Sequence, residues 1–367
     1  MRSHRCGIVL DIMSVAIFAT ASLAPLVGIC AGLGQLRDKE EKRQLASFPI
    51  ITPNLKSWAT APAAFTAYFN DHFGFRKTLV QFYALVKVKV LGESTTPDVV
   101  VGRQGWLYYA AGHSLDSYRG LDSFGPAELR QWTTFFTRMR DWLASRKIRL
   151  YVMFPPDKHT IYPEYLPPSV RRGATATRLE TLTAVLRHAD IDVIDIRDSL
   201  FRAKAAGPLF HLTDTHWNGN GGYVAYRAIL SEISKAFPRV HPYPRSDFGA
   251  WRPRATGDLN SMLGLTRGYE EDFLLLVPKK DASVRHQDGD VIVTECDDSQ
   301  LPRMVMMHDS FGNFIHAPLS QSFRRAAFIG RNNFDPALME REMPDLVLFE
   351  LVERRLAEAV PSGVPES

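Results

Sequence analysis

Short apolar segments alternate with amphipathic ones in the chain beyond residue 125. Apolar residues recur with helical spacing in segments 126–147, 175–189 and 218–237. The short apolar runs, which predict buried strands, are 149–154, 191–196, 303–307, 326–329 and 346–349. Helices that alternate with short buried strands are typical of a mainly parallel sheet covered on both faces. The pattern therefore predicts an α/β fold arranged as a three-layer sandwich.

Functional residues of such sheets lie beyond the C-terminal ends of the strands. Ser310 occupies such a place, between the predicted strand 303–307 and a short predicted helix. A serine at this turn exposes its hydroxyl, and the helix N-terminus offers N–H groups to a developing oxyanion. It could equally be a simple helix cap. Ser310 is therefore a candidate nucleophile that requires partners elsewhere in the chain.

Asp214 and His216 are candidate partners, because residues two apart in an extended segment project from the same face. The carboxylate can fix the imidazole tautomer while the other ring nitrogen faces the nucleophile. Glycines at 219, 221 and 222 permit a tight entry into the next helix. Taken singly, Asp214 could be a helix cap and His216 a surface histidine.

A metal site is an alternative use of the same segment. His211, Asp214 and His216 offer imidazole and carboxylate ligands that suit zinc, iron or manganese. His308 would have to complete the set from far along the chain. The residues alone leave both interpretations open. Because no other histidine or glutamate cluster offers to complete a metal site, we expect no bound metal, and we expect no cofactor.

The N-terminal 36 residues predict a membrane anchor. An uncharged, mostly apolar run from Ile12 to Leu33 is long enough to cross a bilayer. A cleaved signal peptide would have a shorter apolar run, so we expect an uncleaved anchor over 1–36, although Ala19-Thr20-Ala21 could be a cleavage site. A linker is expected over 37–62, a catalytic domain over 63–360 and a tail over 361–367. The net charge of +4 is too mild to predict nucleic-acid binding.

Asp214-Thr215-His216-Trp217 with its glycine-rich continuation, followed later by Asp309-Ser310-Phe311, resembles the alginate O-acetyltransferase family of the AlgJ/AlgX type. Segments 71–76, 101–108, 156–164 and 353–354 also match. The resemblance implies an SGNH-hydrolase-like domain in which Asp214, His216 and Ser310 form a triad. Ordinary SGNH hydrolases carry the serine first, so the order here is the permuted one of the acetyltransferase branch.

One residue departs from the family pattern. His308 stands two residues before the serine, where the family usually has glycine, and its side chain could crowd the turn or add a second imidazole. The oxyanion donors are not placed by any motif. The backbone N–H of Ser310 is the first candidate, and Lys158 is a second one because it follows a strand end.

The activity that the resemblance implies is transfer of an acetyl group, through an acetyl ester of Ser310, to a hydroxyl of an exported, alginate-like polysaccharide. Acetyl-CoA is absent outside the cytoplasm, so a membrane-bound O-acyltransferase would supply the acetyl group. We accordingly expect an inner-membrane protein with its catalytic domain in the periplasm. Two alternatives are an acetyl esterase that uses the same triad and a non-catalytic glycan-binding subunit.

Overall fold

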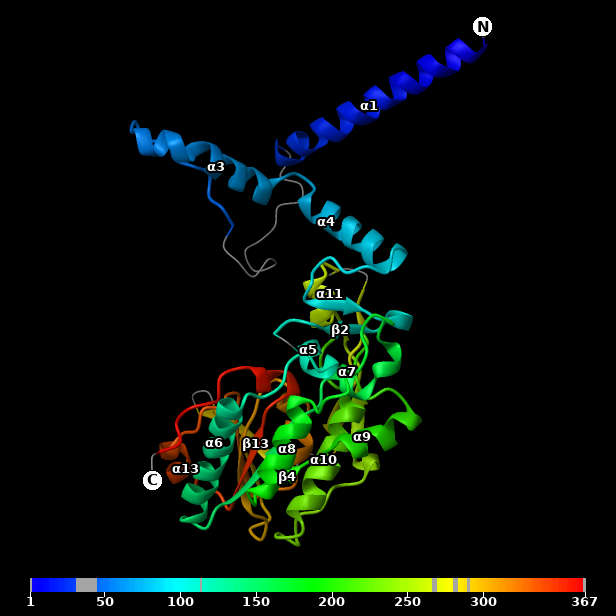
Figure 1. Cartoon of the computed structure of the whole chain (residues 1–367). Helices are drawn as coiled ribbons and strands as arrows, with labels where there is room; N and C mark the ends of the chain where they lie inside the picture. Colours follow the sequence, from blue (N-terminus) through cyan, green and yellow to red (C-terminus); the bar gives the residue numbers. More distant parts are fainter. Residues whose placement is uncertain are drawn as a thin grey trace. The chain divides into compact units, whose positions relative to one another are not determined.

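The computed structural model describes residues 2–30, 45–112, 114–265, 269–279, 283–288 and 291–365. The chain divides into two compact units, Met1–Leu91 and Gly92–Ser367 (Figure 1). The expected start of the catalytic domain at residue 63 falls inside a helix of the first unit. Part of the expected linker, residues 37–44, and the last two residues of the expected tail lie outside the described residues.

The first unit is helical. Its helices are α1 (Arg2–Cys30), α3 (Leu55–His72) and α4 (Arg76–Leu85), and a π-helical turn follows at Val86–Val90. Within α1, the stretch Ile12–Ile29 is long and apolar enough to cross a membrane. The break between α3 and α4 surrounds Gly74, where the helical spacing of the sequence is interrupted.

The second unit is built on a seven-stranded sheet with the order β4-β3-β13-β11-β12-β10-β9. The bounds are β4 (Asp192–Ile194), β3 (Arg149–Met153), β13 (Leu346–Glu350), β11 (Arg303–Met307), β12 (Arg325–Ile329), β10 (Val291–Cys296) and β9 (Ser283–Asp288). The strands from β4 to β12 are parallel, and β10 and β9 extend the sheet in antiparallel fashion. The prediction of a mainly parallel sheet is thus confirmed, whereas the antiparallel edge was not predicted.

Helices cover both faces of this sheet. Along β13, Leu346 and Leu348 belong to one buried cluster, and Val347 and Phe349 to the other. The first cluster is completed by α9 (Arg197–Ala203), α10 (Gly219–Ile233) and α12 (His316–Ser320); the second by α6 (Pro126–Ala144), α8 (Arg178–His188) and α13 (Pro336–Glu342). Figure 1 shows α6 and α13 on one side of the strands and α9 and α10 on the other. Alternate strand residues therefore fill two separate cores.

Smaller elements surround the C-terminal ends of the strands. A β-hairpin is formed by β1 (Val99–Val101) and β2 (Leu107–Tyr109). Between α10 and β9 lies an insertion made of β5 (Phe248–Trp251) paired with β8 (Leu275–Pro278), β6 (Arg254–Ala255) paired with β7 (Glu271–Asp272), and α11 (Asp258–Met262). Two short helices, α5 (Ser114–Arg119) and α7 (Lys158–Ile161), complete this end.

A buried arginine joins the starts of α6 and α8. Arg178, the first residue of α8, is 7% exposed and donates to Asp122 at 2.6 and 2.9 Å and to Glu128 at 2.5 Å. Glu128 also accepts the N–H of Gly125, which is the N-cap of α6. One guanidinium therefore fixes the relative position of two helices on the same face of the sheet.

We expect Arg178→Met to lower the free energy of unfolding by about 2–3 kcal/mol, because it leaves two partly buried carboxylates without their cation. Urea denaturation at neutral pH measures this. The matched control is Arg130→Met on the exposed side of α6, which should stay within about 0.5 kcal/mol of the parent. Equal losses in the two variants would contradict a special role for Arg178.

Candidate active site

The turn after β11 presents Ser310 to solvent. Ser310 is exposed, whereas His308 and Phe311 on either side of it are buried. Asp309 fixes the turn: its Oδ1 accepts the N–H of Phe311 at 3.0 Å, and its Oδ2 accepts the N–H of Val352 at 2.7 Å. The following 3₁₀ turn, Gly312–Phe314, has Phe311 as its N-cap, so Ser310 is not the helix cap that the simpler interpretation assumed.

Glu350 supports the same turn from the neighbouring strand. It is the last residue of β13, is fully buried, and accepts the N–H of Asp309 at 2.9 Å. Burial and the charge of Asp309 raise the pKa of the Glu350 carboxyl well above its usual range. In the described part of the chain its Oε1 has no hydrogen-bond partner. Burial therefore favours the uncharged form of this carboxyl, which ties the end of β13 to the residue before Ser310.

Asp214 and His216 meet in a bent segment rather than in the extended one that the sequence suggested. His216 Nδ1 lies 2.6 Å from Asp214 Oδ1, which also accepts the His216 backbone N–H at 3.0 Å. Burial alone would raise the pKa of the Asp214 carboxyl, but the hydrogen bond and charge of His216 lower it well below its usual range. The ionised Asp214 therefore fixes the proton on Nδ1 and leaves Nε2 as an acceptor.

Ser310 completes this arrangement from a distant part of the chain. Its Oγ lies 2.7 Å from His216 Nε2, the nitrogen that the tautomer leaves unprotonated. The rings of Phe311 and Phe314 lie beside the imidazole, with centroid distances of 4.9 and 5.4 Å. The structure thus brings the three sequence-predicted residues together in one hydrogen-bonded line, Asp214–His216–Ser310.

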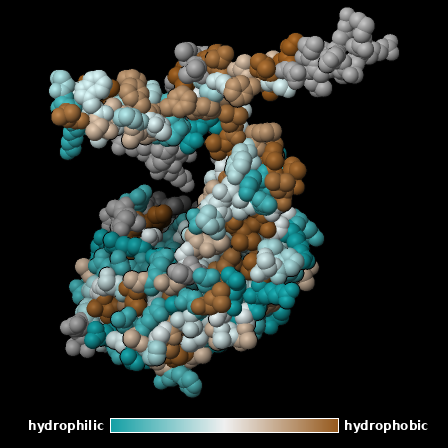
Figure 2. All heavy atoms as spheres, turned by 45° about the horizontal axis from the view of Figure 1, so that its top comes forward, coloured by the Kyte–Doolittle hydropathy of each residue, from teal (hydrophilic) through white to brown (hydrophobic). Residues whose placement is uncertain are grey.

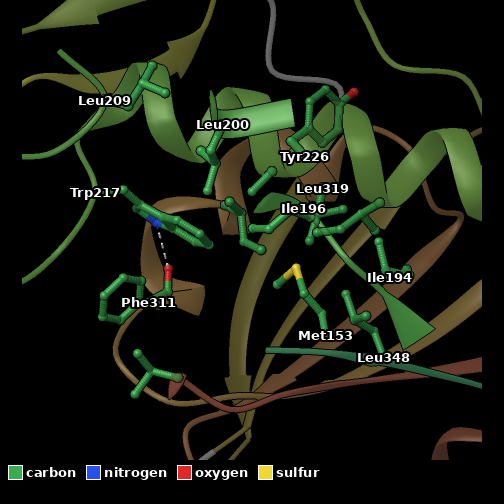
Figure 3. Close-up of a cluster of buried hydrophobic side chains, with 14 of the residues drawn as sticks. Met153, Ile194, Ile196, Leu200, Leu209, Trp217, Tyr226, Phe311, Leu319 and Leu348 are labelled. Atoms are coloured by element: carbon green, nitrogen blue, oxygen red, sulfur yellow. Dashed lines mark hydrogen bonds between the residues drawn. The ribbon is translucent and has the colours of Figure 1, made fainter. Parts of the chain in front are cut away.

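Trp217 connects the segment that contains His216 to the segment that contains Ser310. Its ring is fully buried and donates from Nε1 to the carbonyl oxygen of Phe311 at 3.2 Å (Figure 3). The rings of Trp217 and Phe311 also pack edge to face, with centroids 5.0 Å apart. Trp217 directly follows His216, and Phe311 directly follows Ser310. Their contact therefore fixes the distance between His216 and Ser310.

The glycines after Trp217 permit close packing. They lie in the first turns of α10, and none of the three has a positive φ. A Cβ on Gly221 would lie 2.2 Å from the carbonyl oxygen of Leu209, and one on Gly219 would lie 2.9 Å from that of Leu274. The glycines are therefore not needed for the tight turn that we expected. They instead allow α10 to approach two neighbouring backbone segments closely.

The insertion between α10 and β9 supports Asp214 with residues that the sequence did not indicate. The backbone N–H of Asp258 donates to Asp214 Oδ2 at 2.9 Å, and its side chain accepts the N–H of Thr215 at 2.8 Å. Glu271 accepts the N–H groups of Leu212 and Thr213 at 3.0 and 2.8 Å. Nothing in the local sequence marks these residues, because their partners lie more than 40 positions away.

Lys158 lies at the start of α7 with its ammonium group buried. Its Nζ donates to the carbonyl oxygens of Leu107 at 2.9 Å and Leu212 at 3.2 Å. Burial lowers the pKa of this ammonium to about 8. The described contacts of Lys158 therefore connect the β1–β2 hairpin to the segment that leads into Asp214, and they include no hydrogen bond to Ser310.

His308 turns away from the serine. Its Nδ1 lies 2.6 Å from the carbonyl oxygen of Asp309, and its Nε2 lies 2.8 Å from Nε2 of His316. A Cβ on Gly312 would lie only 2.5 Å from His308 Cγ. The bulk of His308 is thus accommodated by the missing side chain at 312, and its imidazole pairs with His316 instead of adding a second base at Ser310.

Two groups among the described residues have metal-ligand chemistry, Asp214–His216–Asp258 and Asp157–His159–Glu353. The first shares its atoms with the hydrogen-bonded line, and His211 and His308, which the metal alternative required, belong to neither group. In the second group, Asp157 pairs with the Arg354 guanidinium at 2.7 Å. That positive charge disfavours a bound cation.

The sequence matches known proteins over most of its length. A family model described as "SGNH hydrolase-like domain, acetyltransferase AlgX" matches residues 99–324. The protein named "Probable alginate O-acetylase AlgJ" of Pseudomonas aeruginosa is 26% identical over 326 residues, which is 80% of this chain and 79% of the relative. Its Pseudomonas putida namesake is 28% identical over 176 residues, 48% of this chain and 43% of the relative.

Solved structures share the fold. Bacillus cereus PatB1 superposes with a TM-score of 0.55 at 19% identity and covers 70% of this chain and 96% of its own. The O-acetyltransferase domain of P. putida AlgJ gives a TM-score of 0.50 at 21% identity, with 72% and 93% covered. These structures share the layered fold, and together with the family model they confirm the predicted SGNH-hydrolase-like fold.

The buried carboxyl of Glu350 predicts a pH dependence of stability. Its pKa is raised in the folded state, so its contribution is fully present below the unfolded pKa of about 4.3 and is lost as the pH rises toward the folded value. We expect Glu350→Gln, which stays neutral, to remove this component. Urea denaturation between pH 5 and pH 9 should then show a flatter free energy of unfolding than in the parent.

The control for this measurement is Glu358→Gln, a carboxylate on the exposed surface. Its pH dependence should run parallel to that of the parent. A Glu350→Gln protein with the same pH dependence as the parent would show that the carboxyl is ionised in the folded state.

Proposed function

The chain belongs to the family of SGNH hydrolase-like acetyltransferases of the AlgX type, and from this premise we propose that it acetylates hydroxyl groups of an exported, alginate-like polysaccharide through an acetyl ester of Ser310. The observation that carries the proposal is the hydrogen-bonded line Asp214–His216–Ser310, with contacts of 2.6 and 2.7 Å. The name of the P. aeruginosa relative supports the choice of acetyl group and polysaccharide.

In the first half-reaction, Ser310 Oγ attacks the carbonyl carbon of the donor's acetyl group. His216 Nε2 takes the hydroxyl proton, and the ionised Asp214 stabilises the imidazolium through Nδ1–H. The C–O or C–S bond to the donor then breaks, and the imidazolium returns the proton to the leaving group. The product is an acetyl-Ser310 ester with neutral His216.

In the second half-reaction, a sugar hydroxyl attacks the ester carbonyl. His216 Nε2 takes its proton, and the same proton passes to Ser310 Oγ as the ester bond breaks. The serine is regenerated and the sugar carries the acetyl group. No cofactor takes part in this sequence, because each step moves only one proton and one acyl group.

The backbone N–H of Ser310 is our proposed oxyanion donor. Within the described part of the chain it donates to no protein acceptor, so it is available to the tetrahedral intermediate. We assign Lys158 a positioning role instead, because its two described hydrogen bonds go to the carbonyls of Leu107 and Leu212. It thereby fixes the start of the segment that contains Asp214 and His216.

The cellular setting is part of the same proposal. Helix α1 fits a membrane anchor. We infer that it holds the protein in the bacterial inner membrane with the catalytic unit in the periplasm, where the acceptor polysaccharide passes. Acetyl-CoA is absent there, so a membrane-bound O-acyltransferase is the proposed acetyl donor.

If Ser310 is the nucleophile, Ser310→Ala should lower acetyl transfer by several orders of magnitude, as loss of a triad member does. Stability should change by at most about 1 kcal/mol, since the side chain is exposed and caps no helix. Intact-protein mass spectrometry after brief exposure to an activated acetyl ester should show one adduct that maps to Ser310. The His216→Ala protein should give none.

Ser299→Ala, an exposed serine outside the site, is the matched control and should label like the parent. Labelling that persists without Ser310 would refute the nucleophile. The acceptor is tested separately, by following the labelled protein with and without alginate. Release of free acetate at the same rate in both cases would identify an esterase.

A further inference from the structure

Helix α3 carries an exposed apolar stripe. Leu55, Trp58, Phe65 and Phe69 follow one another at spacings of three, seven and four residues, which place them on one side of an α-helix. Their exposed fractions are 92%, 63%, 39% and 40%. Large apolar side chains concentrated on one helix face mark an interaction surface.

Helix α4 has a similar face. Leu79, Phe82 and Tyr83 have the spacing of adjacent helical turns and are 49%, 61% and 54% exposed. Val90, at the end of the π-helical turn, is 72% exposed. Figure 2 shows hydrophobic and hydrophilic side chains next to each other on the surface of these N-terminal helices.

Helices α3 and α4 and the π-helical turn carry a net positive charge. Residues 55–90 contain five Lys or Arg and one Asp, a surplus of four positive charges that equals the net charge of the whole chain. Lys56 lies between Leu55 and Trp58 in the sequence. Lys87 and Lys89 lie between Tyr83 and Val90. An amphipathic helix with aromatic residues on one face and basic residues beside them is suited to the surface of an anionic bilayer.

We propose that α3 and α4 lie along a bilayer that contains anionic phospholipid, with their aromatic stripes at the boundary between headgroups and acyl chains. Continuity with α1 supports this choice, since the apolar stretch Ile12–Ile29 precedes α3 in the same unit. Trp58 and Tyr83 have the amphipathic rings that concentrate at membrane interfaces. The proposal goes beyond the acetyl-transfer chemistry and does not depend on it.

The test uses the full chain in lipid nanodiscs, so that α1 is anchored in every sample. In a background with Cys6, Cys30 and Cys296 changed to Ser, a single cysteine replaces Trp58 or Tyr83 and carries an environment-sensitive fluorophore. The discs contain lipids with a doxyl quencher near the headgroup. We expect quenching of both probes at least about threefold stronger than at a control probe on Leu121→Cys, an exposed leucine of the catalytic unit.

The charge component is tested in the same discs. Lys56→Glu, Lys87→Glu and Lys89→Glu together should reduce quenching at position 58 in discs with phosphatidylglycerol, and change it little in discs of phosphatidylcholine. Probes at 58 and 83 that are quenched no more than the Leu121 control would overturn the proposal and indicate a protein partner for these faces. Acetylation of Ser310, measured on the same samples, reports separately on the catalytic proposal.

Discussion

The hydrogen bond between the buried Glu350 carboxyl and the N–H of Asp309 is the contact on which the turn at Ser310 depends. Strands β11 and β13 are parallel neighbours, so their ends reach the same edge of the sheet. Asp309 returns the connection by accepting the N–H of Val352. Two carboxyl groups therefore satisfy the backbone of each other's strand, and Ser310 is the residue left facing solvent between them.

These two hydrogen bonds explain why an acidic side chain is buried at the end of β13. Burial as deep as that of Glu350 disfavours the charged form of its carboxyl group. The free-energy cost of burying this acid accompanies a turn whose backbone is fixed on both sides of Ser310, and functional sites commonly depart from ordinary core composition in this way.

The sequence predicted those parts of the fold that follow from local pattern. Strand β11 was predicted with its observed bounds because Arg303–Met307 is a short apolar run that ends at a turn. Strand β9 was not, because Ser283–Asp288 is an edge strand with polar residues and no apolar alternation. In the site, Asp214 and His216 are close in sequence and were recognisable together. Glu350 and Asp258 act through partners far along the chain, which no local spacing reveals.

The insertion that supports Asp214 has a consequence for exchanging segments between related proteins. Asp258 and Glu271 belong to the insertion, yet they fix the carboxylate and the backbone that precedes it. A chimera that kept Asp214, His216 and Ser310 but took residues 248–278 from a relative would alter the support of the line without changing any of its side chains. The position of the Asp214 carboxylate is therefore set by this insertion as much as by the motif that contains it.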